Sequence, residues 1–221
     1  MMVEVSCRGL LFDLDGVLVD STPAVARVWT TWAVEHGLNP EETVRRAHGR
    51  PSVATIRELV PTADVEKEND IILRGEIEDT RGVVPLPGAR ELLGSLKNHQ
   101  WVLVTSCARP LAEVRLKAAG LPMPELMITC DDVRRGKPDP EPYEKGAALL
   151  GIPVQDCAVF EDAPAGIRAG KAAGATVIAL TTTAPVAELD EAGADLVISG
   201  FPKIAVFSNN GSGVIRLRVT G

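Results

Sequence analysis

Two aspartates, Asp13 and Asp15, lie one residue apart at the end of an apolar run, in the stretch "LLFDLDGVLVDS" (residues 10–21). Side chains two positions apart on a strand point to the same side, so we expect both carboxylates to point together at the carboxyl end of a strand. In open α/β sheets, ligands bind at that end. Two like charges about 4 Å apart repel by roughly 4 kcal/mol at an effective dielectric constant of about 20. A bound cation, or a proton on one carboxylate, would relieve this repulsion.

A second pair of acids, Glu161 and Asp162, follows the apolar run "CAVF". If this run is another strand of the same sheet, its acids meet the first pair at one edge. Hard carboxylate oxygens are the ligands that suit Mg²⁺. The alternative is that Glu161 and Asp162 only cap the helix expected over 163–173. Together with the first pair, they favour a magnesium site.

Two further positions could hold a phosphoryl group, whose negative charge must be offset before a carboxylate can approach it. Lys137 lies in the loop "RRGKPDPEPY", where a glycine and prolines restrict the backbone around it. Ser106 ends the apolar run "WVLVTS" and can donate a hydrogen bond to a phosphate oxygen, a role for which Thr105 is the rival. A hydroxyl at a strand end is common, so Ser106 is informative only together with the other groups.

Alternating strand and helix patterns would bring these groups together. Each helical pattern ends at a glycine, which suits a helix C-terminus. Strands that alternate with helices of this length predict βαβ units and a parallel sheet, hence an α/β fold. The expected strands cover residues 9–14, 101–106, 125–129, 157–161, 176–180 and 194–199, and the expected helices cover 111–120, 141–151 and 163–174.

The segment between the first two expected strands interrupts this alternation. Its stretches "AVARVWTTWAVEHG", "SVATIRELV" and "VEKENDIILRGEIEDT" have helical patterns. We therefore predict a discontinuous α/β core over residues 1–20 and 85–221, with a small helical domain of residues 21–84 inserted over the sheet. A turn-rich stretch followed by alternating apolar residues also predicts a β-hairpin within residues 203–221.

The composition of the 221-residue chain argues against several classes of partner and location. A hydrophobic fraction of 45% is typical of a globular protein with a core. The net charge of −7 argues against a nucleic-acid or anionic-membrane partner, and no apolar run approaches the ~18 to 20 residues that a membrane span needs. Four widely spaced cysteines, with no signal-peptide pattern, favour a cytoplasmic protein. We expect a monomer or a weak homo-oligomer.

The ordered motifs resemble those of the haloacid dehalogenase superfamily. "DLDGV", a strand ending in "TS", "GKP" and "ED" follow one another between Gly9 and about Ser199, each at an expected strand end or helix start. The resemblance implies a Rossmann-like parallel sheet and makes the insert a C1-type helical cap. The stretches "HGR" (48–50), "LPGARELL" and "FEDAPAGIRAGKAAG" are most similar to bacterial phosphatases of sugars and sugar alcohols in the β-phosphoglucomutase-like branch.

The resemblance also implies a role for each motif residue. Asp13 would be the nucleophile that forms an aspartyl-phosphate, and Asp15 would be the general acid and base. Ser106 and Lys137 would hold the transferring phosphoryl group. The Mg²⁺ ligands would be Asp13, the backbone carbonyl of Asp15, Asp162 and, either as a ligand or just behind the ligands, Glu161.

Four more residues are candidates for contact with the substrate. Cys107 stands where the family more usually has Gly or Ala. We interpret it as an inert small residue; the alternative is that it crowds the phosphate loop. The cap loop "AHGRPS" (47–52) contains His48 and Arg50, which could bind sugar hydroxyls or the phosphate; the alternative is that both are surface turn residues. Arg109 follows the second motif and could face the same pocket.

We predict a cytoplasmic, Mg²⁺-dependent phosphatase of small phosphorylated sugars or sugar alcohols. A sugar phosphomutase on the same scaffold would share every motif, and a catalytically silent binding protein would keep the fold. A tyrosine-phosphatase mechanism on Cys107 is excluded, because the position that would need arginine is Glu113. A phosphonatase would need a cap lysine, and the only lysine of the insert, Lys67, lies in the polar stretch "VEKEND".

Overall fold

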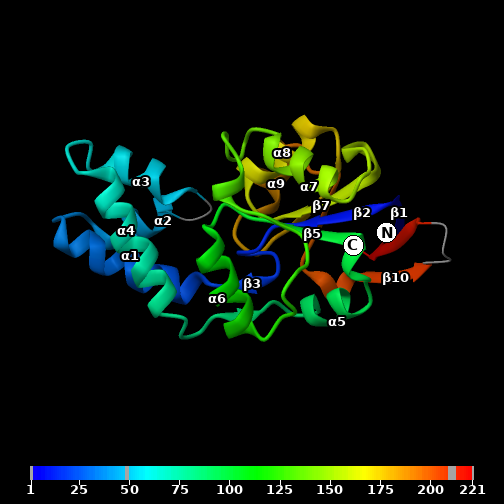
Figure 1. Cartoon of the computed structure of the whole chain (residues 1–221), viewed down its shortest axis with the longest axis horizontal. Helices are drawn as coiled ribbons and strands as arrows, with labels where there is room; N and C mark the ends of the chain where they lie inside the picture. Colours follow the sequence, from blue (N-terminus) through cyan, green and yellow to red (C-terminus); the bar gives the residue numbers. More distant parts are fainter. Residues whose placement is uncertain (1, 48–49, 209–212, 221) are drawn as a thin grey trace.

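The computed structural model describes residues 2–47, 50–208 and 213–220. In this part of the chain, six parallel strands form the central sheet, in the order β6-β5-β2-β7-β8-β9 (Figure 1). Their bounds are β2 Gly9–Phe12, β5 Trp101–Val104, β6 Met127–Ile128, β7 Cys157–Glu161, β8 Thr176–Leu180 and β9 Leu196–Ile198. Each predicted strand is present, so the predicted α/β class with a parallel sheet is confirmed.

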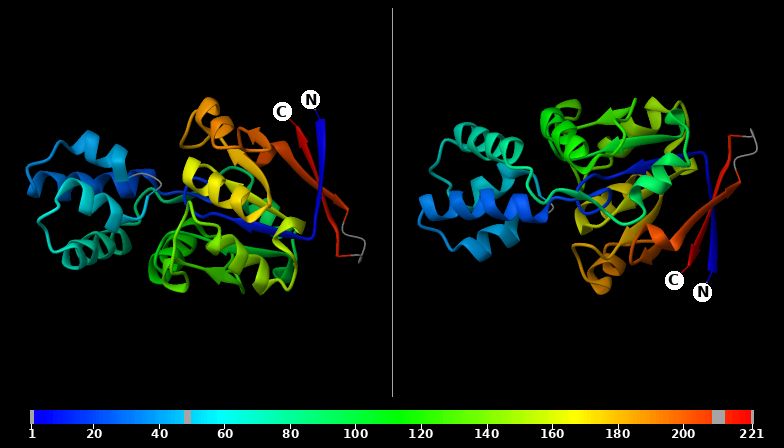
Figure 2. Two further views of the ribbon diagram at one scale, coloured as in Figure 1. Left: turned by 90° about the horizontal axis from the view of Figure 1, so that it is seen from above. Right: turned by 90° about the horizontal axis from the view of Figure 1, so that it is seen from below.

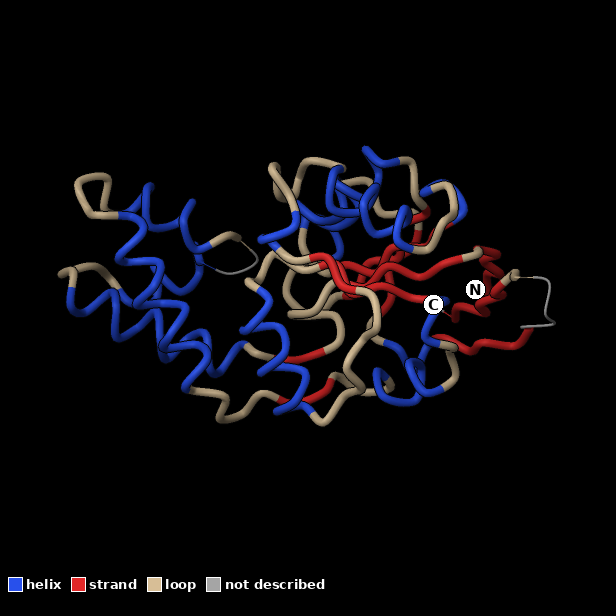
Figure 3. The backbone as a smooth tube through the Cα atoms, viewed as in Figure 1, coloured by secondary structure: helices blue, strands red, loops and turns tan. Residues whose placement is uncertain are grey.

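Helices cover both faces of this sheet (Figures 1 and 3). One face carries α7 (Glu141–Leu149), α8 (Pro164–Ala173) and α9 (Val186–Glu191), and the other carries α5 (Ala89–Gly94) and α6 (Arg109–Ala119). Along β2, Leu10 and Phe12 pack with α5 and α6, whereas Leu11 packs with α7 and α8. Because both faces of β2 are buried, its sequence is a continuous apolar run rather than an alternating one.

Four helices of the inserted segment pack around an apolar cluster of their own. They are α1 (Thr22–Glu35), α2 (Pro40–Ala47), α3 (Ser52–Leu59) and α4 (Val65–Glu78). The cluster includes Trp29 and Trp32 of α1, whose ring centroids lie 5.4 Å apart, together with Ile56 and Ile72. The sequence patterns predicted α1, α3 and α4 but not α2. Figure 2 shows these helices standing apart from the sheet.

The chain enters and leaves these four helices side by side. Strands β3 (Val19–Asp20) and β4 (Val84–Pro85) form an antiparallel pair at this point. This strand pair and the separate apolar cluster support the predicted division into a core (1–20 and 85–221) and a cap (21–84). We propose this division on the strength of these two features.

A second, three-stranded antiparallel sheet lies at the end of the molecule far from α1–α4 (Figure 1). It consists of β1 (Met2–Cys7), β11 (Ile215–Thr220) and β10 (Ile204–Ser208), in that order. The predicted hairpin of β10 and β11 is confirmed, whereas β1 was not predicted. Its buried face carries Ile215, Leu217 and Val219 against the core. Short 3₁₀ helices cover Asn98–Gln100, Cys130–Asp132, Val154–Asp156 and Phe201–Lys203.

Candidate active site

A cavity of about 250 Å³ lies between the carboxyl ends of the sheet strands and the inserted helices. One wall comes from the loops after β2, β5 and β7 and from the loop before α7, and the opposite wall comes from α1, α3 and α4. The predicted site residues that line this cavity are Asp13, Asp15, Arg50, Ser106, Cys107, Lys137, Glu161 and Asp162.

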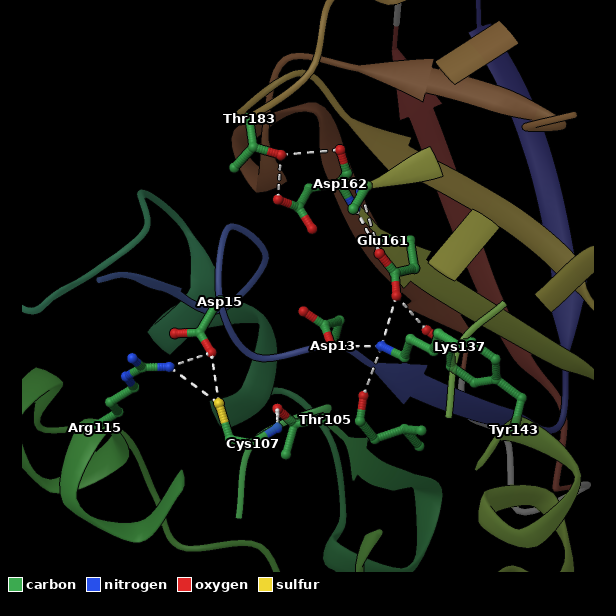
Figure 4. A network of polar contacts seen from close by, with 12 residues as sticks. Asp13, Asp15, Thr105, Cys107, Arg115, Lys137, Tyr143, Glu161, Asp162 and Thr183 are labelled. Atoms are coloured by element: carbon green, nitrogen blue, oxygen red, sulfur yellow. Dashed lines mark hydrogen bonds and ion pairs between the residues drawn. The ribbon is translucent and has the colours of Figure 1, made fainter. Parts of the chain in front are cut away.

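Lys137 is the cation closest to Asp13 (Figure 4). Its Nζ donates to Asp13 Oδ1 at 2.5 Å, to Glu161 Oε1 at 2.6 Å and to the carbonyl oxygen of Val104 at 3.1 Å. Burial alone would lower the pKa of Lys137, but the adjacent Asp13 and Glu161 carboxylates raise it well above its usual value. The lysine therefore stays charged, with its three N–H bonds directed at fixed oxygens.

Glu161 has both carboxylate oxygens occupied by protein donors. Oε1 accepts from Lys137 Nζ and, at 2.6 Å, from the hydroxyl of the fully buried Tyr143. Oε2 accepts from the backbone N–H groups of Asp162 and Ala163, at 3.0 and 3.3 Å. Those two amides precede α8, and the start of this helix has no side-chain cap hydrogen bond. Glu161 also fixes the position of Lys137, which capping alone would not do.

Asp162 lies against the tight turn that follows the first aspartate pair. Its Oδ2 accepts from the hydroxyl of Thr183 at 2.5 Å. Gly16 has a φ of 76°, and a Cβ at this position would lie 1.9 Å from Asp162 Oδ2. The hydroxyl of Thr182 donates to the carbonyl oxygen of Gly16. Sequence reasoning missed both threonines, which follow β8 in a stretch without a motif.

Three carboxylates of the site form a group that fits a divalent cation. Asp13, Glu161 and Asp162 each offer an oxygen within 4.8 Å of the others, and all three residues are buried. Burial raises the pKa of Asp13 to about 7, although Lys137 acts in the opposite direction. Burial, followed by the charges of Glu161 and Asp13, also raises the pKa of Asp162 well above its usual value. One ammonium faces three carboxylates, so an excess of negative charge remains for a metal to offset.

Asp15 does not point with Asp13, contrary to the expectation from strand alternation. Strand β2 ends before Asp13, and the chain then turns, so the alternation of a strand no longer applies. Asp15 Oδ2 accepts from Arg115 Nη1 at 2.6 Å and from Cys107 Sγ at 3.1 Å, and Oδ1 accepts from the hydroxyl of Ser21 at 2.6 Å. The two aspartates therefore line one cavity but bind different cations (Figure 4).

Cys107 is not the inert residue that we expected. Its thiol donates to Asp15, and its Sγ lies 3.0 Å from Arg115 Nη1. Burial, with the charge of Asp15, raises the pKa of the Cys107 thiol well above its usual value, so the S–H donor is retained. The hydroxyl of buried Thr105 accepts from the Cys107 amide at 3.1 Å, whereas Ser106 is half-buried and lines the cavity. Thr105 also lines the cavity, and its hydroxyl proton remains available, so the two hydroxyls stay alternatives as the phosphate donor.

Arg115 is the main site residue that sequence reasoning missed. It is 3% exposed, and its Nη2 donates to Glu76 Oε2 of α4 at 2.9 Å. The pattern of the stretch "LAEVRLKAAG" predicts only a helix. A signal was present, because Arg115 lies four residues after Leu111 and four before Ala119, which places it on the apolar stripe of α6. A charged residue on such a stripe needs a buried partner.

The structure gives less support to the remaining residues that were predicted to contact the substrate. Arg50 lines the cavity, and its Nη1 pairs with Glu58 Oε2 of α3 at 2.8 Å. Arg109 is not among the lining residues, because its Nη2 binds Asp132 Oδ2 at 3.0 Å on the loop after β6. The structure therefore does not bring Arg109 into the pocket that we expected it to face. His48 lies outside the described residues.

Residues 7–174 match the family model of the haloacid dehalogenase-like hydrolases. The chain belongs to this family. Hexitol phosphatase A of Escherichia coli (strain K12) is 44% identical over 214 residues, which cover 95% of this chain and 98% of the relative. 2-Deoxyglucose-6-phosphate phosphatase 1 of Saccharomyces cerevisiae is 35% identical over 239 residues, which cover 97% and 96%.

A solved structure of a haloacid dehalogenase family hydrolase from Deinococcus radiodurans R1 has the same architecture. It contains bound phosphate and sodium, and it aligns with a TM-score of 0.67 at 28% identity, covering 89% of this chain and 92% of that chain. The resemblance inferred from the motifs is thus confirmed. The predicted class of enzyme, a phosphoric monoester hydrolase, is confirmed by the relatives of this haloacid dehalogenase-like chain.

No helix in the described ranges of the chain is long and apolar enough to cross a membrane.

Proposed function

We propose that this chain is a Mg²⁺-dependent phosphatase of small phosphorylated sugars or sugar alcohols. The observation that carries the proposal is the buried Asp13 carboxylate, held by Lys137 beside Glu161 and Asp162 in a cavity covered by helices. The cavity volume of about 250 Å³ suits a small metabolite rather than a polymer. The named substrates of the relatives, a hexitol phosphate and a deoxyhexose phosphate, support the substrate class.

The first step would transfer the phosphoryl group to the protein. An oxygen of Asp13 attacks the phosphorus, the bond to the sugar oxygen breaks, and Asp15 gives its proton to that leaving oxygen. In the second step Asp15 takes a proton from water, and the hydroxide attacks the aspartyl-phosphate and releases phosphate and the Asp13 carboxylate. Ser106 would donate to a phosphoryl oxygen, and the ammonium of Lys137 beside Asp13 would offset the charge of the phosphoryl group in both steps.

Asp13, Asp162 and the backbone carbonyl of Asp15 would hold Mg²⁺. When bound, the ion supplies positive charge against the phosphoryl oxygens and permits the approach of the Asp13 carboxylate. Glu161 is better assigned as a partner of Lys137 than as a direct ligand, because four protein donors already occupy its oxygens. From the sequence alone, Glu161 could be either a direct ligand or a residue just behind the ligands.

The direct test is phosphate release from a panel of sugar and polyol phosphates, with Mg²⁺ and with EDTA. We expect release that depends on the metal and is lost in Asp13→Asn, which keeps the shape of the side chain but removes the nucleophilic carboxylate. Isomerisation of a hexose 1-phosphate on addition of a bisphosphate primer, without release, would instead indicate a phosphomutase. Absence of both reactions in folded protein would favour a binding protein.

A further inference from the structure

The guanidinium group of Arg115 joins two parts of the molecule. Arg115 belongs to α6, which packs on the sheet, and it is 3% exposed. Its Nη1 donates to Asp15 Oδ2 at 2.6 Å, and its Nη2 donates to Glu76 Oε2 at 2.9 Å. Glu76 belongs to α4 of the inserted helices. One buried cation is thus shared by a carboxylate on each side of the cavity (Figure 4 shows the Asp15 side).

Both carboxylates of this group are also held by other donors. The indole N–H of Trp29 donates to Glu76 Oε1 at 3.2 Å, which fixes the second oxygen of Glu76 from within the same helical part. On the opposite side, Ser21 and Cys107 donate to the two oxygens of Asp15. The planar guanidinium fork presents its N–H groups in a fixed geometry, so a single guanidinium can bind two carboxylates that lie in different directions.

The energetics of burial make this arrangement sensitive to the position of α4. A buried charge that loses one partner is strongly destabilised, because water cannot reach it to compensate. If α4 moved away, Arg115 would keep its Nη1 contacts to Asp15 and Cys107, but its Nη2 would lose Glu76 and turn toward the entering solvent. Asp15 lies outside the strands of the sheet, in an isolated bridge with Val19, and its carboxylate is held by these side-chain contacts.

We propose that Arg115 is a positioning residue that couples the docking of helix α4 to the orientation of the Asp15 carboxylate. The proposal rests on the proposed role of Asp15 as general acid and base. Arg115 acts through Asp15. When α4 is docked, Glu76 holds one end of the guanidinium, and the other end aims Asp15 at the leaving oxygen. When α4 is displaced, proton transfer is disabled.

Two substrates with different leaving groups separate this role from a structural one. Sorbitol 6-phosphate releases an alkoxide, which needs a proton from Asp15, whereas 4-nitrophenyl phosphate releases a stabilised phenolate, which does not. The measured quantity is kcat/KM, because it covers only the steps up to departure of the leaving group. For Arg115→Met we expect a fall of about 100-fold or more with sorbitol 6-phosphate, within the range of a general acid, and less than about 3-fold with 4-nitrophenyl phosphate.

Four further variants make the test specific. Glu76→Gln should show the same substrate selectivity with a smaller fall, about 10-fold, and the double variant should be no worse than Arg115→Met, because the two residues act as one unit. The kcat/KM of Arg115→Lys with sorbitol 6-phosphate should lie between those of wild type and Arg115→Met. The control is Arg90→Met, since Arg90 binds the carbonyl oxygens of Ala119 and Gly120 at the far end of α6 and does not touch Asp15. Arg90→Met should change kcat/KM by the same factor with both substrates.

Equal losses with both substrates in Arg115→Met, or additive losses in the double variant, would overturn the proposal. If Arg115→Met does not fold, the falls in kcat/KM with the two substrates are measured for Arg115→Lys and Glu76→Gln instead. Asp15→Asn separates the role of Asp15 as general acid from the role of Arg115 in positioning it. If wild type hydrolyses both phosphates and Asp15→Asn selectively loses sorbitol 6-phosphate, the proposed function stands, and a non-selective Arg115 variant refutes only the role of Arg115. A wild type that hydrolyses neither phosphate overturns both.

Discussion

At the scale of single residues, Asp13 and Asp15 are neighbours in sequence but are bound by different cations. Lys137 holds Asp13, and Arg115 holds Asp15. The repulsion expected from the sequence is therefore reduced by two side chains before any metal is considered. Because the two surroundings differ, one carboxylate can serve as a nucleophile while the other exchanges protons.

The hydroxyl group of Tyr143 should make a measurable contribution to the free energy of unfolding, and it can be removed without changing the shape of the core. It is fully buried, and its hydroxyl donates to Glu161 Oε1 at 2.6 Å. In Tyr143→Phe, a buried carboxylate loses one donor, so we expect the free energy of unfolding to fall by about 2 kcal/mol. Urea denaturation measures this change. An unchanged midpoint and slope would mean that the hydroxyl does not stabilise Glu161.

The proposed metal site predicts a stability change that does not depend on turnover. At a Mg²⁺ concentration of about 100 times Kd, the free energy of unfolding should rise by about 2.7 kcal/mol, or about 5–10 °C in Tm for a chain of this size. Asp162→Asn should abolish this rise in thermal melts. Asp190→Asn, at an exposed position of α9, should retain it. An equal rise in all three proteins would argue against Asp162 as a ligand.

At the scale of elements, the sequence predicted the parts that bury an unbroken apolar run. The strands around "FDLDG" and "CAVFE" were recognised because both of their faces are covered. The two-residue strands β3 and β4 were not, since so short a pair has no periodicity to detect. Strand β1 was missed because its stretch "MVEVSC" carries polar side chains on one face and has its partner at the other end of the chain.

The same limits apply to the site. Asp13, Lys137, Glu161 and Asp162 were found because each follows a recognisable strand or lies in a motif loop. The direction of Asp15 depends on a contact with α6 that no local pattern encodes, and the apolar stripe of α6 indicates that Arg115 needs a buried partner but not which one.

Helix α8 allows a sharp test of how closely it packs on the site. A Cβ at Gly166 would lie 1.7 Å from Glu161 Oε1, so Gly166→Ala must displace Glu161 or the helix. We expect the free energy of unfolding to fall by about 1–3 kcal/mol, although the same change usually favours a helix. Gly94→Ala in α5 is the matched control, because a Cβ there meets nothing within 4 Å. Equal urea midpoints for both variants would contradict this packing.

The start of α7 predicts a pH dependence. Hydrogen bonds from Lys145 and from the backbone amides of Arg134 and Arg135 lower the pKa of Glu141 from 4.5 to about 2. A group with a lowered pKa in the folded state stabilises the fold above its unfolded pKa, and this stabilisation is lost as the pH falls through the folded pKa. Thermal melts should therefore show Glu141→Gln below wild type at pH 6, with a gap that closes between about pH 4.5 and pH 2.

Glu144→Gln on the same helix serves as the control for this effect. Its side chain is exposed, so we expect a smaller Tm difference from wild type over the same pH range. A gap for Glu141→Gln that persists at pH 2 would assign its effect to packing rather than to charge.

At the scale of the whole molecule, the second sheet should stabilise the core from the side opposite the cavity. Leu217 of β11 is fully buried in the cluster that contains β2 and α5. Leu217→Ala should lower the free energy of unfolding by about 2–5 kcal/mol in urea denaturation, with kcat of the folded protein unchanged. Arg216→Ala, on the exposed face of the same strand, should have little effect on either quantity. A similar loss in both variants would contradict the assignment of the two faces.

The pairing of β1 with β11 has a consequence for how the protein is made. Residues 2–7 leave the ribosome long before their partners, residues 215–220, do. The central strand β2 likewise waits for β5 and β7. Helices α1–α4, by contrast, find all members of their apolar cluster within one continuous stretch of chain. During translation, the part that covers the cavity can therefore fold while the part that carries Asp13 is still waiting for its neighbours.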